Sequence, residues 1–155
     1  MVFWLYYPLA HTISKIITEE KPDVIFDPYL HALGIKNTEE SLEIYAGRLP
    51  KFTKTYWVNW FGQRDAVIHK KNLTLENHTL ITASNHKVNL LYKEFDCNAD
   101  MVLNMIDDRH CVDVLGANLG LNLSEIREYG TIFVFCTKDG CKMEYQDSER
   151  FKFEK

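Results

Sequence analysis

Aromatic side chains are concentrated in two short segments of this chain, and that concentration constrains the fold more than any other feature. All three tryptophans belong to these segments, which contain Phe3, Trp4, Tyr6, Tyr7, Phe52, Tyr56, Trp57, Trp60 and Phe61. Aromatic rings gathered in this way form one face of a small β-core or line a binding pocket. The two segments are therefore expected to supply either a core face or a pocket.

The length of 155 residues fits a single domain with one core. Apolar residues make up 46% and charged residues 26%, which is typical of a globular protein and excludes a low-complexity scaffold. No apolar run reaches the roughly 18 to 20 residues of a bilayer span, and the first ten residues lack the positive charge of a signal peptide. We expect a soluble, unexported protein, whose four cysteines would then be thiols or metal ligands.

The second aromatic segment predicts β-structure. Residues 54–61 are β-branched and aromatic and end before Gly62, so alternation predicts a strand covered on both faces. Residues 65–75 predict a second strand, and the turn between them predicts a hairpin. Residues 79–82 are expected to continue the sheet.

Helical spacing of apolar residues predicts several helices around this hairpin. They are expected at 12–20, at 38–46 with Thr38 as a cap, at 87–95 after Ser84 and Asn85, at 99–106, and at 123–129 with Ser124 as a cap. The segments 131–136 and 141–145 flank Asp139 and Gly140, a favoured tight-turn pair, and predict a C-terminal hairpin. This order of elements indicates a mixed α+β fold rather than a doubly wound parallel sheet.

Positive charge is concentrated in the middle of an acidic chain. The formal net charge is −4, yet residues 51–73 contain five basic side chains and one acidic side chain. The five are Lys51, Lys54, Arg64, Lys70 and Lys71. Such a patch suits phosphate or an acidic partner, or it is simply a solvated strand face.

The sequence from 56 to 75, YWVNWFGQRDAVIHKKNLTL, resembles the central hairpin of a PWWP domain, and Trp4-Leu5-Tyr6-Tyr7-Pro8 is similar to the signature that names that family. The resemblance implies a small antiparallel β-barrel built from residues 1–10 and 51–83. Residues 11–50 would then be a helical insertion, and residues 84–155 a C-terminal extension of helices and a hairpin. The strand that usually precedes the signature is absent, so the barrel would be short of a strand, or completed by the C-terminal hairpin or by a partner.

The same resemblance implies a function. In PWWP domains an aromatic cage binds a methylated lysine of the histone H3 tail, and the matching positions here are Trp4, Tyr7 and Trp60. The faces of electron-rich rings attract a methylated ammonium, which supports this assignment. The resemblance further implies that Lys51, Lys54, Arg64, Lys70 and Lys71 contact nucleosomal DNA, and that the protein is nuclear.

Other chemistry has little support in the sequence. Cys136 and Cys141 are weak candidates for a zinc knuckle, and buried free thiols are the better interpretation. No phosphate loop, nucleophile elbow or metalloprotease motif is present, so no catalytic residue and no cofactor are predicted. The leading hypothesis is a non-enzymatic chromatin reader that binds a methylated histone tail. The alternative is a protein–protein interaction or assembly module in which the aromatics form core or a subunit interface.

Overall fold

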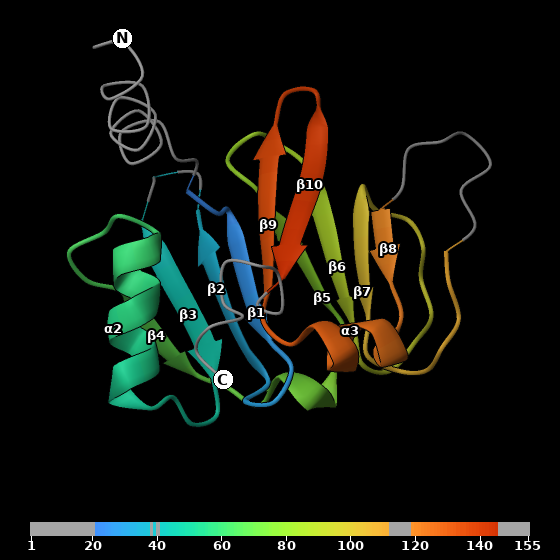
Figure 1. Cartoon of the computed structure of the whole chain (residues 1–155), viewed down its shortest axis with the longest axis horizontal. Coiled ribbons are helices and arrows are strands. Elements are labelled where there is room, and N and C mark those ends of the chain that lie inside the picture. The colour runs from blue at the N-terminus through green and yellow to red at the C-terminus, as the bar shows by residue number, and fades with distance from the viewer. Residues whose placement is uncertain (1–20, 38, 40, 112–118, 146–155) are drawn as a thin grey trace, which may run out of the picture.

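The computed structural model describes residues 21–37, 39, 41–111 and 119–145, and these form two β-sheets and two α-helices (Figure 1). The six-stranded sheet, here called sheet A, has the order β10-β9-β1-β2-β3-β4. It consists of β1 (Val24–Asp27), β2 (Ala32–Lys36), β3 (Leu42–Ala46), β4 (Val67–Lys70), β9 (Ile132–Thr137) and β10 (Gly140–Tyr145). Sheet B has the order β5-β6-β7-β8 and consists of β5 (His78–Ile81), β6 (Lys87–Leu91), β7 (Met101–Asn104) and β8 (Leu119–Leu121).

Helices complete the architecture. Helix α2 (Lys51–Trp60) joins β3 to β4, the 3-10 turn η1 (Leu73–Leu75) joins the two sheets, and helix α3 (Leu123–Tyr129) leads from sheet B back to β9. Neither α-helix in the described ranges is long and apolar enough to cross a bilayer. The predicted mixed α+β class is confirmed, but the described strands form two open sheets and not the small closed barrel expected from the sequence.

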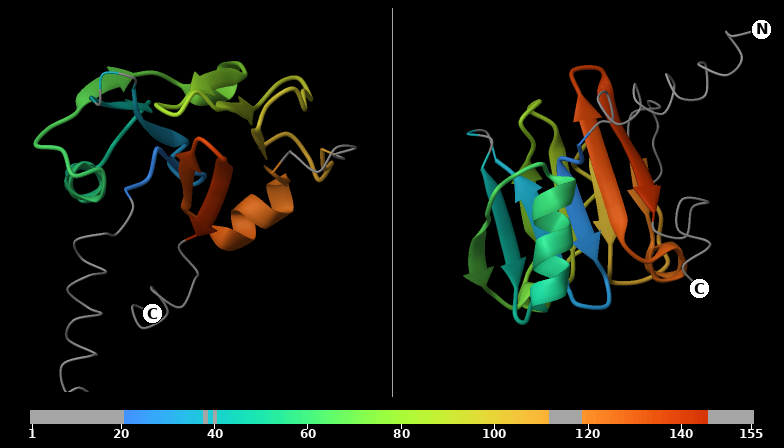
Figure 2. Two further views of the ribbon diagram at one scale, coloured as in Figure 1. Left: turned by 90° about the horizontal axis from the view of Figure 1, so that it is seen from above. Right: turned by 60° about the vertical axis from the view of Figure 1, so that its left-hand side comes forward.

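Sheet A is the central layer because its inner strands β1, β2 and β9 are apolar on both faces. In β1, Val24 and Phe26 face sheet B, whereas Ile25 between them faces α2. The first core lies between the sheets and contains Leu33, Leu90 and Leu103 from the two sides. The second core lies on the opposite face of sheet A, where α2 packs (Figure 2, left).

Helix α2 is the crossover of a β3-α2-β4 unit, since β3 and β4 are parallel neighbours. It buries Trp57, Val58 and the following Phe61 against sheet A. Gly34 in β2 permits the close approach, because a Cβ at this position would lie only 2.9 Å from Cε3 of Trp57. The helix ends at Trp60, and Gly62, two residues later, takes a positive φ of 67° that turns the chain away.

This helix corrects the predicted strand at 54–61. High β-propensity in Tyr56, Trp57 and Val58 favours a strand in isolation, but burial at positions 57, 58 and 61 follows the helical period. The hairpin predicted between 54–61 and 65–75 is therefore wrong, and β4 pairs with β3 instead. The structural basis of the PWWP resemblance, an aromatic strand followed by a tight turn, is absent.

Most other predicted helices are also strands. The insertion expected to be helical contains β1, β2 and β3 in its described part, and residues 12–20 lie outside the described residues. The segments at 87–95 and 99–106 contain β6 and β7, in which nearly every residue is buried. A strand buried on both faces is a continuous apolar run that periodicity does not distinguish from a buried helix. The strand near 79–82, helix 123–129 and the C-terminal hairpin are confirmed.

The cysteines are joined in two disulfides, Cys97–Cys111 and Cys136–Cys141. The prediction of free thiols or metal ligands is therefore wrong, and the candidate zinc ligands Cys136 and Cys141 are bonded to each other. These two face one another across the β9–β10 hairpin, so the hairpin geometry itself brings them together. The other bridge joins the segment between β6 and β7 to the segment that follows β7.

Replacing Gly34 with alanine should lower the free energy of unfolding by about 1–3 kcal/mol, because the new methyl group overpacks the Trp57 indole. Gly47→Ala is the matched control, since a Cβ there meets only a backbone oxygen at 3.9 Å. Urea unfolding followed by tryptophan fluorescence measures the free energy of unfolding of both variants. Equal stability of the two variants would contradict the packing of α2 on β2.

Candidate functional site

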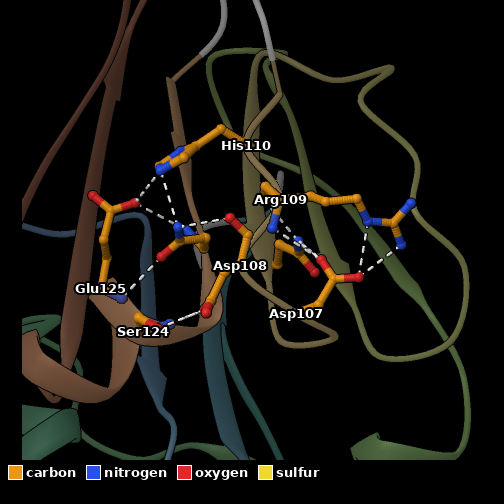
Figure 3. A network of polar contacts seen from close by, with 8 residues as sticks. Asp107, Asp108, Arg109, His110, Ser124 and Glu125 are labelled. Carbon is orange, nitrogen blue, oxygen red and sulfur yellow. Dashed lines mark hydrogen bonds and ion pairs between the residues drawn. The ribbon is translucent and has the colours of Figure 1, made fainter.

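A network of polar side chains lies at the carboxyl ends of β7 and β8 (Figure 3). Asn104 ends β7 and Asn122 follows β8, and both are buried. The two strands are parallel, so the segments that follow them meet at one edge of sheet B. Such edges often carry binding and catalytic groups in sheets of parallel strands.

Asp107 holds the segment after β7 in place. Its carboxylate accepts hydrogen bonds from the Arg109 backbone amide at 3.0 Å and from Nε of the Arg109 guanidinium at 2.8 Å. These bonds, with a further one from Asn104, hold the pKa of Asp107 at about 2. The same guanidinium lies 4.3 Å from the centre of the Phe95 ring, so it is fixed on two sides.

Asn122 caps helix α3. Its side chain accepts a hydrogen bond from the Glu125 amide at 3.0 Å, and the Glu125 carboxylate accepts one from the Asn122 amide at 3.2 Å. This is a capping box. Ser124, the predicted cap, instead donates its hydroxyl to Asp108 at 2.5 Å. The predicted helix is thus right and its predicted cap is wrong by two positions.

His110 lies at the exposed end of the network. Its Nε2 lies 3.0 Å from Oε1 of Glu125 and 3.0 Å from Nδ2 of Asn122. The Ser124 hydroxyl and the His110 imidazole are therefore held by different partners, and the geometry is not that of a nucleophile activated by its base. Within the described ranges no group of three or more potential ligands is arranged to hold a metal ion. What the network does is fix the start of α3 to the segment after β7.

A second surface gathers the basic residues predicted from the sequence. Lys51 and Lys54 lie on α2, Arg64 lies in the loop after it, and Lys70 ends β4. Lys71 follows directly. Helix α2 lies over the β3–β4 end of sheet A (Figure 1), so Lys51, Lys54, Arg64 and Lys70 gather at this end. Lys71 pairs with Glu76 instead.

Three aromatic residues of α2 at helical spacing extend from the core to this surface. Trp60 is half-buried, and its ring meets the Phe133 ring edge-on with 4.9 Å between ring centres. The rings of Tyr56 and Trp60 are tilted, with centres 5.6 Å apart, and Phe52 meets Tyr56 edge-on with ring centres 4.6 Å apart. Phe52 is 71% exposed and Tyr56 is 44% exposed. Of the three predicted cage residues, Trp60 is thus part of this row, and Trp4 and Tyr7 lie outside the described residues.

Residues of β4 add to the same surface. Ile68 and Lys70 are in register with Ile44 and Ala46, which face α2. Paired residues of neighbouring strands point to the same side of a sheet, so Ile68 and Lys70 also point to the α2 side. We call this surface the aromatic–basic surface, made of Phe52, Tyr56, Ile68, Lys51, Lys54, Arg64 and Lys70.

The sequence prediction places Phe52 and Tyr56 in a core face or a pocket, whereas the structure exposes both on the surface. Their spacing of four residues, continued to Trp60, indicates one stripe of a helix. That signal was present in the sequence, but the alternation of β-branched and aromatic types over the same residues obscured it.

Comparison with known proteins identifies a relative in Rickettsia conorii. Over 58 residues this chain is 47% identical to a protein named "Uncharacterized protein RC0016", and the match covers 37% of this chain and 73% of that protein. The two proteins belong to one family. The name of the relative assigns no activity. No protein-family model matches the chain, and no solved structure matches it significantly.

Replacing Arg109 with glutamine should raise the pKa of Asp107 from about 2 toward its ordinary value, because the guanidinium bond is lost. In the native protein the folded-state pKa is depressed, so the stability from this carboxylate is present above about pH 4 and is lost as the pH falls toward 2. The chemical shift of the Asp107 carboxyl carbon, followed by NMR as a function of pH, measures the pKa in the native protein and in the variant. An unchanged Asp107 titration in the variant would contradict the pairing.

Replacing Asn122 with alanine should lower the free energy of unfolding by about 1–2 kcal/mol, since α3 loses its cap. Ser124→Ala is the control and should lower the free energy of unfolding less, because it removes only an exposed hydrogen bond to Asp108. Thermal unfolding followed by circular dichroism compares the two. A larger loss for the Ser124 variant would return the cap to the predicted position.

Proposed function

We propose that this chain is an interaction module of a disulfide-stabilised protein, and that it binds a protein partner through the aromatic–basic surface. The observation that carries the proposal is the exposure of Phe52 and Tyr56 at the outer end of a row of contacting rings that starts at Phe133 in the core. Large rings held in place lose little conformational entropy on binding, which is why such residues dominate interface energetics.

Exposed apolar residues are concentrated on this part of the molecule. Four of the seven large apolar residues that are exposed in the described chain come from α2 and β4. They are Phe52, Tyr56 and Ile68, which belong to the aromatic–basic surface, and Val67, which points to the other face of the same edge strand. Clustering of exposed apolar residues, with a charged rim, is typical of protein interaction sites.

The disulfides support a location outside the reducing cytosol. Stable cystine pairs form and persist in oxidising compartments and are rare in the cytosol and the nucleus. We therefore place the module in an oxidising environment, such as a periplasm or a cell exterior. A nuclear location, inferred from the PWWP resemblance, has no support in the described chain.

The prediction of a methyl-lysine reader stays a prediction. Two of its three cage residues lie outside the described residues, and the third, Trp60, packs against Tyr56 and Phe133. The hairpin that carried the resemblance is a helix followed by a strand paired elsewhere. The arrangement therefore favours the alternative drawn from the sequence, an interaction module.

Photo-crosslinking in cells that produce the protein tests the proposal. A photoreactive phenylalanine at position 52 or 56 should form adducts heavier than the monomer, because both side chains would be buried by the partner. Leu75 is the matched control, since it is 67% exposed on η1 and outside the aromatic–basic surface. Adducts of equal yield at all three positions, or none at 52 and 56, would overturn the proposal.

A further inference from the structure

The outer edge of β4 is an unpaired sheet edge within the described chain. β4 is the last strand of sheet A, paired with β3 on one side only (Figure 2, right). Val67 is 54% exposed and Ile68 is 41% exposed, so neither side of this edge strand is covered by the rest of the described fold. Exposed β-branched residues on an edge strand favour the addition of another strand.

The hydrogen-bonding groups that face outward can be assigned from the register. The Lys71 amide donates to the Ala46 carbonyl at 3.0 Å, so residue 71 faces β3. Residues of a strand in a parallel pair alternate in direction, and Val67 and His69 therefore also face β3. The backbone N–H and C=O groups of Ile68 and Lys70 point away from the sheet.

The other sheet edges are less suited to strand addition. β10 carries the exposed charged residues Lys142 and Glu144, an arrangement that discourages pairing. β5 exposes one large apolar residue, Ile81. In contrast to β5 and β10, β4 combines two large exposed apolar residues in succession with outward-facing backbone groups.

Charge next to this edge selects the partner. Within the described residues Lys54 pairs with Asp65 and Lys71 pairs with Glu76, whereas Lys51, Arg64 and Lys70 have no ion pair there. These three cations belong to the aromatic–basic surface. An added strand with acidic side chains would pair with them and would place its apolar side chains over Ile68 toward Phe52 and Tyr56.

We propose that β4 binds an extended acidic segment of a partner protein by strand addition, through the backbone of Ile68 and Lys70. This inference rests on the proposed function and names its partner class and its binding mode. Main-chain hydrogen bonds provide affinity in this mode, and the alternate side chains of the added strand provide specificity.

The test uses a twelve-residue peptide with the repeat Val-Thr-Glu-Thr as the probe, titrated into the full-length isotope-labelled protein. This repeat places valine and glutamate on the same face of the added strand, where Ile68 and Lys70 also point. Amide resonances of residues 67–70 should shift, and hydrogen exchange at Ile68 and Lys70 should slow at least tenfold at saturation. Two control peptides should bind at least tenfold more weakly. One replaces glutamate with lysine, and the other keeps every side chain but is N-methylated at alternate residues, which removes the backbone donors along the edge that would face β4.

Two variants of one residue separate backbone pairing from side-chain contact. Ile68→Pro removes an outward-facing amide and no bond to β3, so the fold should persist and peptide binding should be lost. Ile68→Thr retains the amide and should still bind. Circular dichroism and urea unfolding confirm that both variants are folded.

Several outcomes would overturn strand addition at β4. They are equal binding by the proline and threonine variants, equal binding of the N-methylated peptide, and shifts confined to residues outside β4. Self-association through β4 that the peptide does not displace would also overturn it and would make a second copy the occupant. Peptide binding that fails while crosslinks at 52 and 56 persist would overturn this inference and leave the proposed function standing.

Discussion

The contact between the Trp57 indole and Gly34 holds the layered structure together on one side of sheet A. Because β2 carries no side chain at that position, α2 packs close enough to bury Trp57, Val58 and Phe61 in a core of its own. With α2 seated there, the chain crosses from β3 to a parallel β4. The edge position of β4 and the outward row of Phe52 and Tyr56 both follow from this one contact.

The opposite end of the molecule is held by polar and covalent links. Tyr92, after β6, meets Nδ1 of His31 in the β1–β2 turn at 2.9 Å, and burial raises the pKa of this tyrosine, which therefore keeps its proton. Hydrogen bonds from the Asn122 and Ser124 side chains to Asp108, together with the Cys97–Cys111 bridge, fix the segment after β7. A firm scaffold of this kind suits a protein whose binding groups lie at one edge, since preorganised groups lose less entropy on binding.

Some elements could be predicted from local signals because their neighbours in sequence are also their partners in space. The C-terminal hairpin has alternating residues and an Asp139-Gly140 turn, and its strands pair directly across that turn. Helix α3 has a short amphipathic pattern and a capping residue beside it. The basic residues from 51 to 71 were found for the same reason, since charge clustered in the sequence stays clustered on one helix and the next strand.

Elements that depend on distant partners could not be assigned this way. The residues Tyr56, Trp57 and Val58 have β-propensity, yet they are helical because α2 buries Trp57 and Val58 against a strand more than twenty residues earlier. The segments of β6 and β7 are mostly apolar and buried at nearly every position, and only their pairing with sheet neighbours makes them strands. The pairing of Cys97 with Cys111 likewise depends on the path of the chain around β7.

The sequence by itself determined a mixed α+β chain of globular composition, with aromatic and basic residues clustered between 51 and 71. These are properties of residue type and short-range order, so they hold whatever tertiary fold the chain adopts. Only the tertiary structure decided that this cluster is a helix and an edge strand rather than a hairpin, and that the cysteines are paired. The physical reason is that the free energy gained by burying side chains between layers exceeds local secondary-structure propensity. That gain depends on residues that are distant in the sequence.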